Sequence, residues 1–68
     1  MQKGTVKMWN AQRGFGFIIT EDGDELFVNA NDIHPALQKR GLREGHRVKF
    51  DVRSDMKGDK AVHVRLDT

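Results

Sequence analysis

The segment Arg13-Gly14-Phe15-Gly16-Phe17-Ile18 alternates between two kinds of side chain. Successive residues of a β-strand point to opposite faces of the sheet, so Phe15 and Phe17 share one face and Ile18 takes the other. Gly14 and Gly16, next to the rings, carry no side chain, which lets a flat ligand approach the backbone at some entropic cost to the strand. We therefore predict a strand over residues 14–20 with one buried face and one exposed face.

The same alternation continues outward in both directions along the chain. It predicts four further strands, over residues 3–10, 25–29, 47–53 and 60–66. Most connections are short and rich in turn-forming residues, which favours antiparallel pairing. The exception is the segment 30–46, which is too long for a hairpin and whose Asn31-Asp32 and Pro35 predict a single helical turn followed by a loop. Five short strands of this kind fit a small all-β barrel.

The face that forms the core can be chosen by counting apolar residues. If Ile18 points inward, the rings of Phe15, Phe17 and Phe27 all stand outside the barrel. The opposite choice makes these rings the core, which is common for phenylalanine, but it would expose Ile18 and the aliphatic residues of the next strand to water. We therefore expect an aliphatic interior that also holds one ring. Its predicted members are Val6, Ile18, Leu26, Val28, Val48, Phe50, Val52, Val62, Val64 and Leu66.

Length and composition exclude several classes of protein. A chain of 68 residues has room for one domain, predicted over residues 1–68, and its lack of cysteine excludes disulfides and cysteine-based zinc sites. No apolar run is long enough to span a membrane, and the N-terminus does not resemble a secretory signal, so we expect a cytoplasmic protein. His34, His46 and His63 lack the spacing of metal ligands. We expect neither an enzyme nor a protein that needs a cofactor.

The formal net charge is +2, but basic and acidic residues are distributed unevenly along the chain. Residues 1–13 contain three basic residues and no acidic one, residues 14–38 contain five acidic residues and no basic one, and residues 39–68 contain nine basic and five acidic residues. The exposed rings lie close in sequence to the cations Lys7 and Arg13. Aromatic faces on which bases stack, together with cations for the phosphates, are what single-stranded nucleic acid requires.

Two motifs carry a resemblance to a known family. Arg13-Gly14-Phe15-Gly16-Phe17-Ile18 resembles the first ribonucleoprotein motif, and Leu26-Phe27-Val28-Asn29-Ala30 resembles the second, in the order and spacing of the bacterial cold-shock proteins. The opening residues 4–10 and the closing residues 57–64 are similar to the same family, so the resemblance covers nearly the whole chain. It implies a five-stranded antiparallel Greek-key barrel of the oligonucleotide-binding type. It also implies binding of single-stranded RNA and DNA with little sequence preference, and an RNA chaperone activity in transcription or translation under stress.

The resemblance also implies a set of nucleic-acid-binding residues. They are Lys7, Met8, Trp9, Asn10, Arg13, Phe15, Phe17, Phe27 and Asn29. The chain departs from the family where it has Met8-Trp9 in place of an aromatic pair and Asn29-Ala30 in place of His and Phe. It also has Leu37-Gln38 where the family has a further Phe. Each aromatic that stacks on a base contributes roughly 1–3 kcal/mol, so weaker binding is expected. Met8 retains apolar contact, and the amide of Asn29 can still hydrogen-bond a base.

Two alternatives remain open from the sequence. The barrel could serve a protein partner and bind nucleic acid only weakly, and the outward position predicted for Ile19 favours this because an exposed aliphatic side chain suits a protein contact. The connection 30–46 could also act as a hinge through which two chains exchange their last strands. We expect a monomer, with the strand-exchanged dimer as the alternative.

Overall fold

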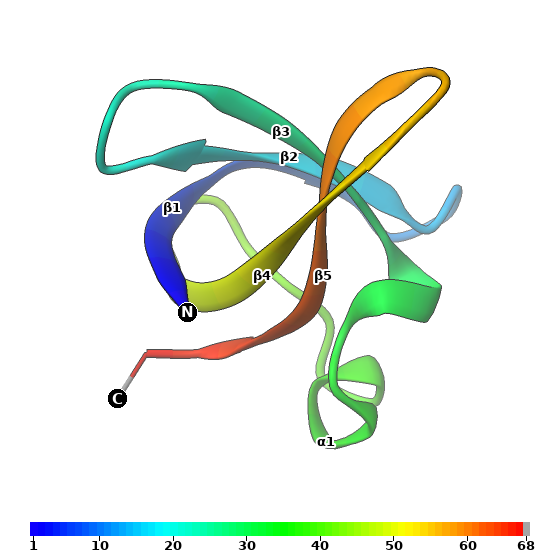
Figure 1. Ribbon diagram of the computed structural model, residues 1–68. Helices are drawn as coiled ribbons and strands as arrows, with labels where there is room; N and C mark the ends of the chain where they lie inside the picture. Colours follow the sequence, from blue (N-terminus) through cyan, green and yellow to red (C-terminus); the bar gives the residue numbers. More distant parts are fainter. Residues whose placement is uncertain (68) are drawn as a thin grey trace.

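The alternating segments form five strands in the computed structural model, which describes residues 1–67 (Figure 1). The strands are β1 (Gln2–Asn10), β2 (Phe15–Thr20), β3 (Glu25–Asn29), β4 (Arg47–Asp55) and β5 (Gly58–Leu66). All five predicted strands are confirmed. Strand β2 begins one residue later than predicted, whereas β4 and β5 extend further and meet at a two-residue turn. That extension makes the β4–β5 hairpin project beyond the other strands (Figure 1).

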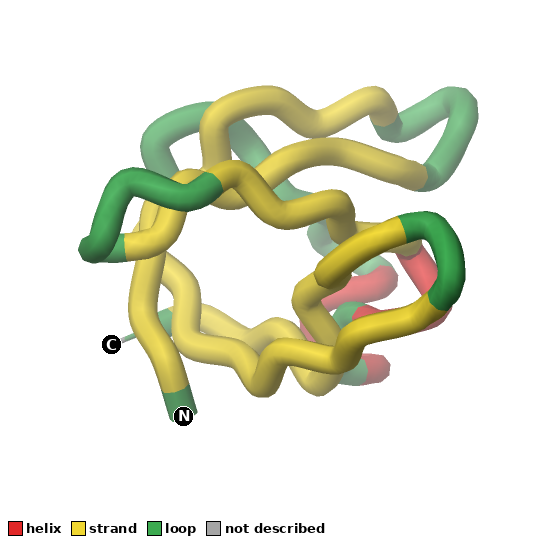
Figure 2. Tube along the Cα trace, turned by 45° about the horizontal axis from the view of Figure 1, so that its top comes forward, coloured by secondary structure: helices red, strands yellow, loops and turns green. Residues whose placement is uncertain are grey.

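The strands close into a barrel in the order β1-β2-β3-β5-β4, which confirms the predicted five-stranded architecture (Figure 2). Neighbouring strands are antiparallel, with one exception at the seam between β3 and β5. This seam is parallel and short, because it pairs only Phe27 with Lys60 and Val28 with Ala61. The long connection after β3 crosses one end of the barrel before β4 begins. As a result, β5 runs parallel to β3.

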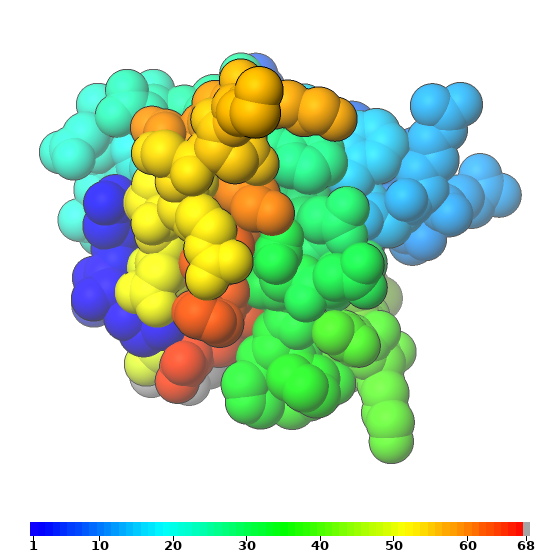
Figure 3. Space-filling model, turned by 45° about the vertical axis from the view of Figure 1, so that its right-hand side comes forward, coloured from blue at the N-terminus to red at the C-terminus, as the bar shows by residue number. Residues whose placement is uncertain are grey.

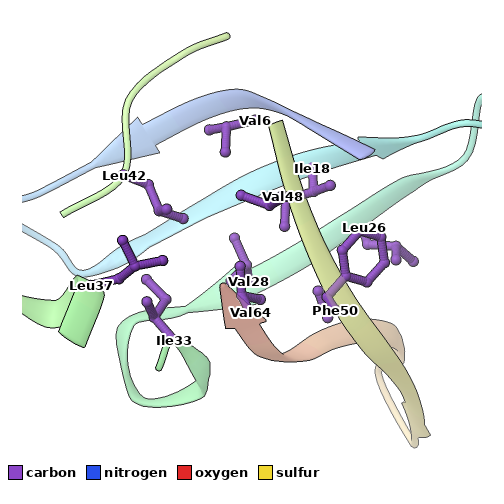
Figure 4. Packing of buried hydrophobic residues seen from close by; sticks show 11 residues of the cluster. Val6, Ile18, Leu26, Val28, Ile33, Leu37, Leu42, Val48, Phe50 and Val64 are labelled. Atoms are coloured by element: carbon purple, nitrogen blue, oxygen red, sulfur yellow. The ribbon is translucent and has the colours of Figure 1, made fainter. Parts of the chain in front are cut away.

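The interior of the barrel is aliphatic apart from one ring (Figure 4). Ile18, Val28, Val48, Phe50 and Val64 are completely buried, as the alternation predicts. The inward position of Ile18 settles the orientation of β2, because it leaves the odd-numbered residues of that strand on the outer face. The core therefore confirms the predicted parity of the central strands.

Val52 differs from the prediction of an inward side chain, whereas Leu66 agrees with it. Val52 is 37% exposed, and it lies in the second half of β4, where all residues from Asp51 to Asp55 are exposed. Its partner across the hairpin, Ala61, fills the interior instead and is completely buried. Leu66 is half-buried and packs against the edge of the core.

The connection between β3 and β4 contributes more to the core than the sequence predicts. It contains two short helices, η1 (Ala30–Asp32) and α1 (Pro35–Gln38), where the sequence predicts a single helical turn. Ile33, Leu37 and Leu42 from this connection are buried and cover one end of the barrel (Figure 4). Leu37, one of the two residues found where the resembling family has a further Phe, is thus a core residue here. No helix within residues 1–67 is long and apolar enough to cross a membrane.

The difference between Val48 and Val52 can be tested with one matched substitution. Val48→Ala removes two buried methyl groups from a residue with 0% exposure, so we expect it to lower the free energy of unfolding by about 2 kcal/mol. Val52→Ala acts on an exposed position, and a loss of less than about 1 kcal/mol is expected. Urea unfolding of both variants measures the two losses. Equal losses would contradict the exposed position of Val52.

Candidate nucleic-acid interface

Three phenylalanine rings form a contiguous cluster on the outer face of β2 and β3. The ring of Phe15 stacks on that of Phe27 with 5.9 Å between centroids and 23° between planes. Phe17 meets both rings edge-on, at 6.4 Å from Phe15 and 5.9 Å from Phe27. Phe27 is 37% exposed, and the other two rings are half-buried. We call Phe15, Phe17 and Phe27 the ring cluster.

Cross-strand pairing explains why the ring cluster is contiguous. Phe17 pairs directly with Phe27, and Phe15 lies two residues away on the same face of β2. The neighbouring residues Ile18 and Val28 point into the core and hold the two strands on the barrel. The prediction that these rings stand outside the barrel is therefore confirmed by their placement.

A bulge in β1 decides which of its residues join this face. The register between β1 and β2 shifts between Val6 and Met8, so that Met8 pairs with Phe17 and Asn10 with Phe15. Without the shift, the alternation that starts at the inward Val6 would turn Met8 and Asn10 inward as well. The bulge thus brings both residues beside the ring cluster, which the alternation alone does not predict.

The same bulge turns Trp9 away from the ring cluster. Trp9 pairs with the buried Gly16, is half-buried itself, and packs against the edge of the core. Its indole Nε1 lies beside the backbone of Gly41 in the long connection. A Cβ at Gly16 would overlap the carbonyl oxygen of Met8, so the close approach of β1 requires glycine at this position. This requirement is separate from the expected approach of a ligand to the same backbone. Within residues 1–67 Trp9 stacks on none of the three phenylalanines.

The predicted cations flank the ring cluster, but one of them is engaged. Lys7 Nζ lies 3.0 Å from Glu25 Oε1 on β3, and both side chains are about half exposed. The ammonium group therefore reaches across β2 and is partly neutralised by this surface ion pair. Arg13 is exposed in the turn between β1 and β2, and its guanidinium makes no ion pair within residues 1–67.

The two predicted amides have structural roles as well. The backbone N–H of Arg13 donates to Oδ1 of Asn10 at 3.1 Å, which closes the turn after β1. The backbone N–H of Asn31 donates to Oδ1 of Asn29 at 3.0 Å, which caps η1. In both cases the oxygen is used by the backbone and the amide NH₂ group remains able to donate to a ligand.

A hollow of about 650 Å³ adjoins the ring cluster between β3 and the β4–β5 hairpin. Phe27 and Asn29 line one side, and the basic residues Lys57 and Lys60 line the other. Figure 3 shows the hairpin, in yellow and orange, facing the green segment that follows β3. Neither lysine is among the site residues predicted from the sequence, because their proximity to Phe27 depends on the parallel β3–β5 seam. The one sequence signal for them is the position of Lys57 in the closing motif.

Acidic side chains reduce the positive charge of this hollow. Asp32 and Asp55 also line it, and Lys60 Nζ lies 3.7 Å from Asp32 Oδ2. Within residues 1–67 no group of three or more His, Asp or Glu side chains is arranged to hold a metal ion. The surface as a whole offers stacking faces, hydrogen-bond donors and partly paired cations, which are the groups that bind bases and phosphates.

Comparison with known proteins agrees with this geometry. The family model described as 'Cold-shock' DNA-binding domain matches residues 2–66. Cold shock protein CspC of Bacillus subtilis (strain 168) is 43% identical over 68 residues, which cover 96% of this chain and 97% of that protein. The major cold shock protein of Streptococcus pyogenes serotype M18 is 43% identical over 67 residues, which cover 94% of each chain. The cold shock-like protein CspC of Bacillus cereus is 43% identical over 65 residues, which cover 91% of this chain and 94% of that protein.

Proposed function

The chain belongs to the cold-shock domain family of nucleic-acid-binding, non-enzymatic proteins, and on that premise we propose that it binds single-stranded RNA and DNA through the ring cluster. The observation that carries the proposal is the exposure of three contiguous rings on a barrel whose core is already filled. Rings that are not needed for the core can stack on bases. Single strands expose the faces of their bases, whereas a duplex keeps them stacked inside, so the ring cluster favours the single-stranded form.

Little sequence preference follows from the chemistry of the ring cluster. Stacking accepts every base, because each base has an aromatic face. The donors beside the rings are the amides of Asn10 and Asn29, which can add hydrogen bonds to a base edge. The cations within reach of phosphates are Lys7, Arg13, Lys57 and Lys60. Their partial pairing with carboxylates and the small number of rings support modest affinity.

An RNA chaperone activity completes the proposal. A protein that binds the unpaired form but not the duplex shifts the equilibrium of weak hairpins toward the open strand by mass action. Modest affinity and low sequence preference suit this role, because the protein can leave one strand and act on another. The proposal places the protein in the cytoplasm, where it meets RNA. We propose that it acts as a monomer, with the strand-exchanged dimer as the alternative.

Removal of one ring tests the role of the ring cluster. Phe27→Ala is expected to weaken binding to a short oligothymidine by roughly 1–3 kcal/mol, because a stacking face is removed. Val52→Ala is the matched control, since Val52 is also 37% exposed but lies outside the ring cluster. Isothermal titration at low salt measures both affinities, and urea unfolding checks that Phe27→Ala still folds.

Three results would contradict the proposal. One is a wild-type protein that does not bind the oligomer at low salt, and another is a folded Phe27→Ala variant with unchanged affinity. The third concerns salt: each phosphate bound on a single strand should contribute about −0.7 to the slope of log affinity against log salt. A flat salt response, together with nuclease-resistant capture of a protein, would favour a protein partner instead.

The ion pair of Lys7 gives a second prediction. Glu25→Gln removes the partner of Lys7 and one negative charge beside the ring cluster, so we expect oligothymidine affinity to rise about two- to fivefold. Glu21→Gln is the matched control, because Glu21 also forms an exposed ion pair, at 3.4 Å from Arg47, but lies away from the rings. Titrations of both variants at the same salt concentration measure the change. An equal gain in both would mean that only net charge matters, and no gain with Glu25→Gln would exclude Lys7 as a phosphate ligand.

A further inference from the structure

A second hollow lies at the end of the barrel that the long connection covers. It measures about 340 Å³ and is lined by three basic or potentially basic side chains, Arg40, Arg43 and His46, with Leu37, Gly41 and Leu66 as its apolar part. The segment after α1 forms its rim, and Figure 3 shows this part of the chain, in yellow-green, projecting from the lower edge of the molecule. None of these three side chains belongs to the predicted binding residues.

Backbone contacts place this hollow beside β1. The N–H of Gly45 donates to the carbonyl of Val6 at 2.8 Å, and the N–H of Val6 donates to the carbonyl of His46 at 2.9 Å. At the other end of the same segment, Gly41 lies next to the indole Nε1 of Trp9. Residues 41–46 therefore run along β1 from Trp9 to Val6. Because β4 precedes β1 and β2 follows it in the barrel, the segment occupies the edge of β1 that faces away from the ring cluster.

The two arginines of the hollow are exposed and not neutralised. Neither Arg40 nor Arg43 makes an ion pair within residues 1–67, and the carboxylate of the adjacent Glu44 pairs with neither of them. Lys3, Lys7, Arg47 and Lys60 each have a carboxylate partner, whereas Arg13 and Arg65, like the two arginines of the hollow, have none within residues 1–67. Guanidinium groups without a carboxylate partner are available for a phosphate, which arginine binds through two parallel N–H donors.

His46 supplies an independent observation. Its Nδ1 is buried from solvent and has no hydrogen-bond partner within residues 1–67. A buried polar nitrogen without a partner is costly, and His46 lines the hollow, so a rotation of the imidazole that brings Nδ1 to an acceptor there would relieve this cost. An oxygen of a phosphate is such an acceptor when the proton is on Nδ1.

We propose that Arg40, Arg43 and His46 form a phosphate site for the backbone of the bound strand, beyond the point where it passes Trp9. The site extends the interface from the ring cluster across β1 to the segment 41–46. Its ligand is a phosphodiester of the same RNA or DNA strand, so it lengthens the binding site without adding a stacked base. This inference rests on the proposed binding of single-stranded nucleic acid.

A length series of oligothymidines tests the phosphate site. The lengths run from about four to about twelve nucleotides, within the range of site sizes known for barrels of this type. The double variant Arg40→Gln/Arg43→Gln is compared with wild type and with Arg65→Gln. Arg65 is a suitable control because it is exposed on β5, lies outside this hollow and makes no ion pair within the described residues.

We expect the double variant to bind the shortest oligomer like wild type and to bind the longest about tenfold more weakly than wild type does. The slope of log affinity against log salt should become shallower by about 0.7 for each phosphate that the double variant no longer binds. Arg65→Gln should change neither quantity at any length. His46→Gln, added to the series, should reduce affinity only at the lengths that the double variant affects.

Each other result overturns the phosphate site. Equal losses at all lengths, or equal losses with Arg65→Gln, would mean that the arginines act through net charge alone. Unchanged affinity of the double variant for every oligomer, while Phe27→Ala weakens binding, would overturn the phosphate site and leave the ring cluster intact. Binding of an acidic protein but not of the longer oligomers would assign the arginines to a protein interface. A wild-type protein that binds no oligomer at all would overturn the proposed function and the phosphate site together.

Discussion

The barrel interior has a limited volume, and the aliphatic side chains that fill it force the ring cluster to the outside. Ile18 and Val28 are completely buried on the same strands that carry Phe17 and Phe27 outward, and the one interior ring, Phe50, comes from β4. A strand cannot bury both of its faces in a barrel of this size. The exposed rings are therefore a direct consequence of core packing. The same constraint gives the protein its stability and its stacking surface.

The charged side chains around the ring cluster modify how strongly this surface attracts a phosphate. Two of the cations near the interface are balanced by a carboxylate, Lys7 by Glu25 and Lys60 by Asp32. These ion pairs are at least partly exposed, so each contributes little to folding but lowers the positive charge that a phosphate meets. In the basic segment after α1, neither Arg40 nor Arg43 is neutralised within residues 1–67. A strand that reached this segment would gain electrostatic interactions that the ring cluster cannot give. Although the net charge of the chain is small, the ring cluster and the segment after α1 therefore differ in how well they can bind phosphate.

The sequence predicts the strands and their inward faces well, because alternation is a local property of each strand. It does not predict the bulge at the middle of β1, since a shift of register depends on how closely β1 approaches Gly16 of the neighbouring strand. That bulge brings Met8 to the ring cluster and turns Trp9 toward the core edge. The exposure of Val52 and the burial of Leu37 are also tertiary effects. Val52 is exposed where the β4–β5 hairpin extends beyond the barrel, and Leu37 is buried because the connection after β3 covers the end of the barrel. Both need the three-dimensional path of the chain.

The most direct test of the central claim is a map of amide chemical shifts during titration of the wild-type protein with an oligothymidine of about ten nucleotides. We predict that the shifts concentrate in the second half of β1, in β2 and β3 around the ring cluster, near Lys57 and Lys60 of the β4–β5 hairpin, and in the segment 41–46. The amides of Lys49 and Arg65, which pair on the wall formed by β4 and β5 away from the hairpin turn, should remain unperturbed. Shifts concentrated on that wall, or no shifts at low salt, would contradict the claim that the exposed rings form the binding surface.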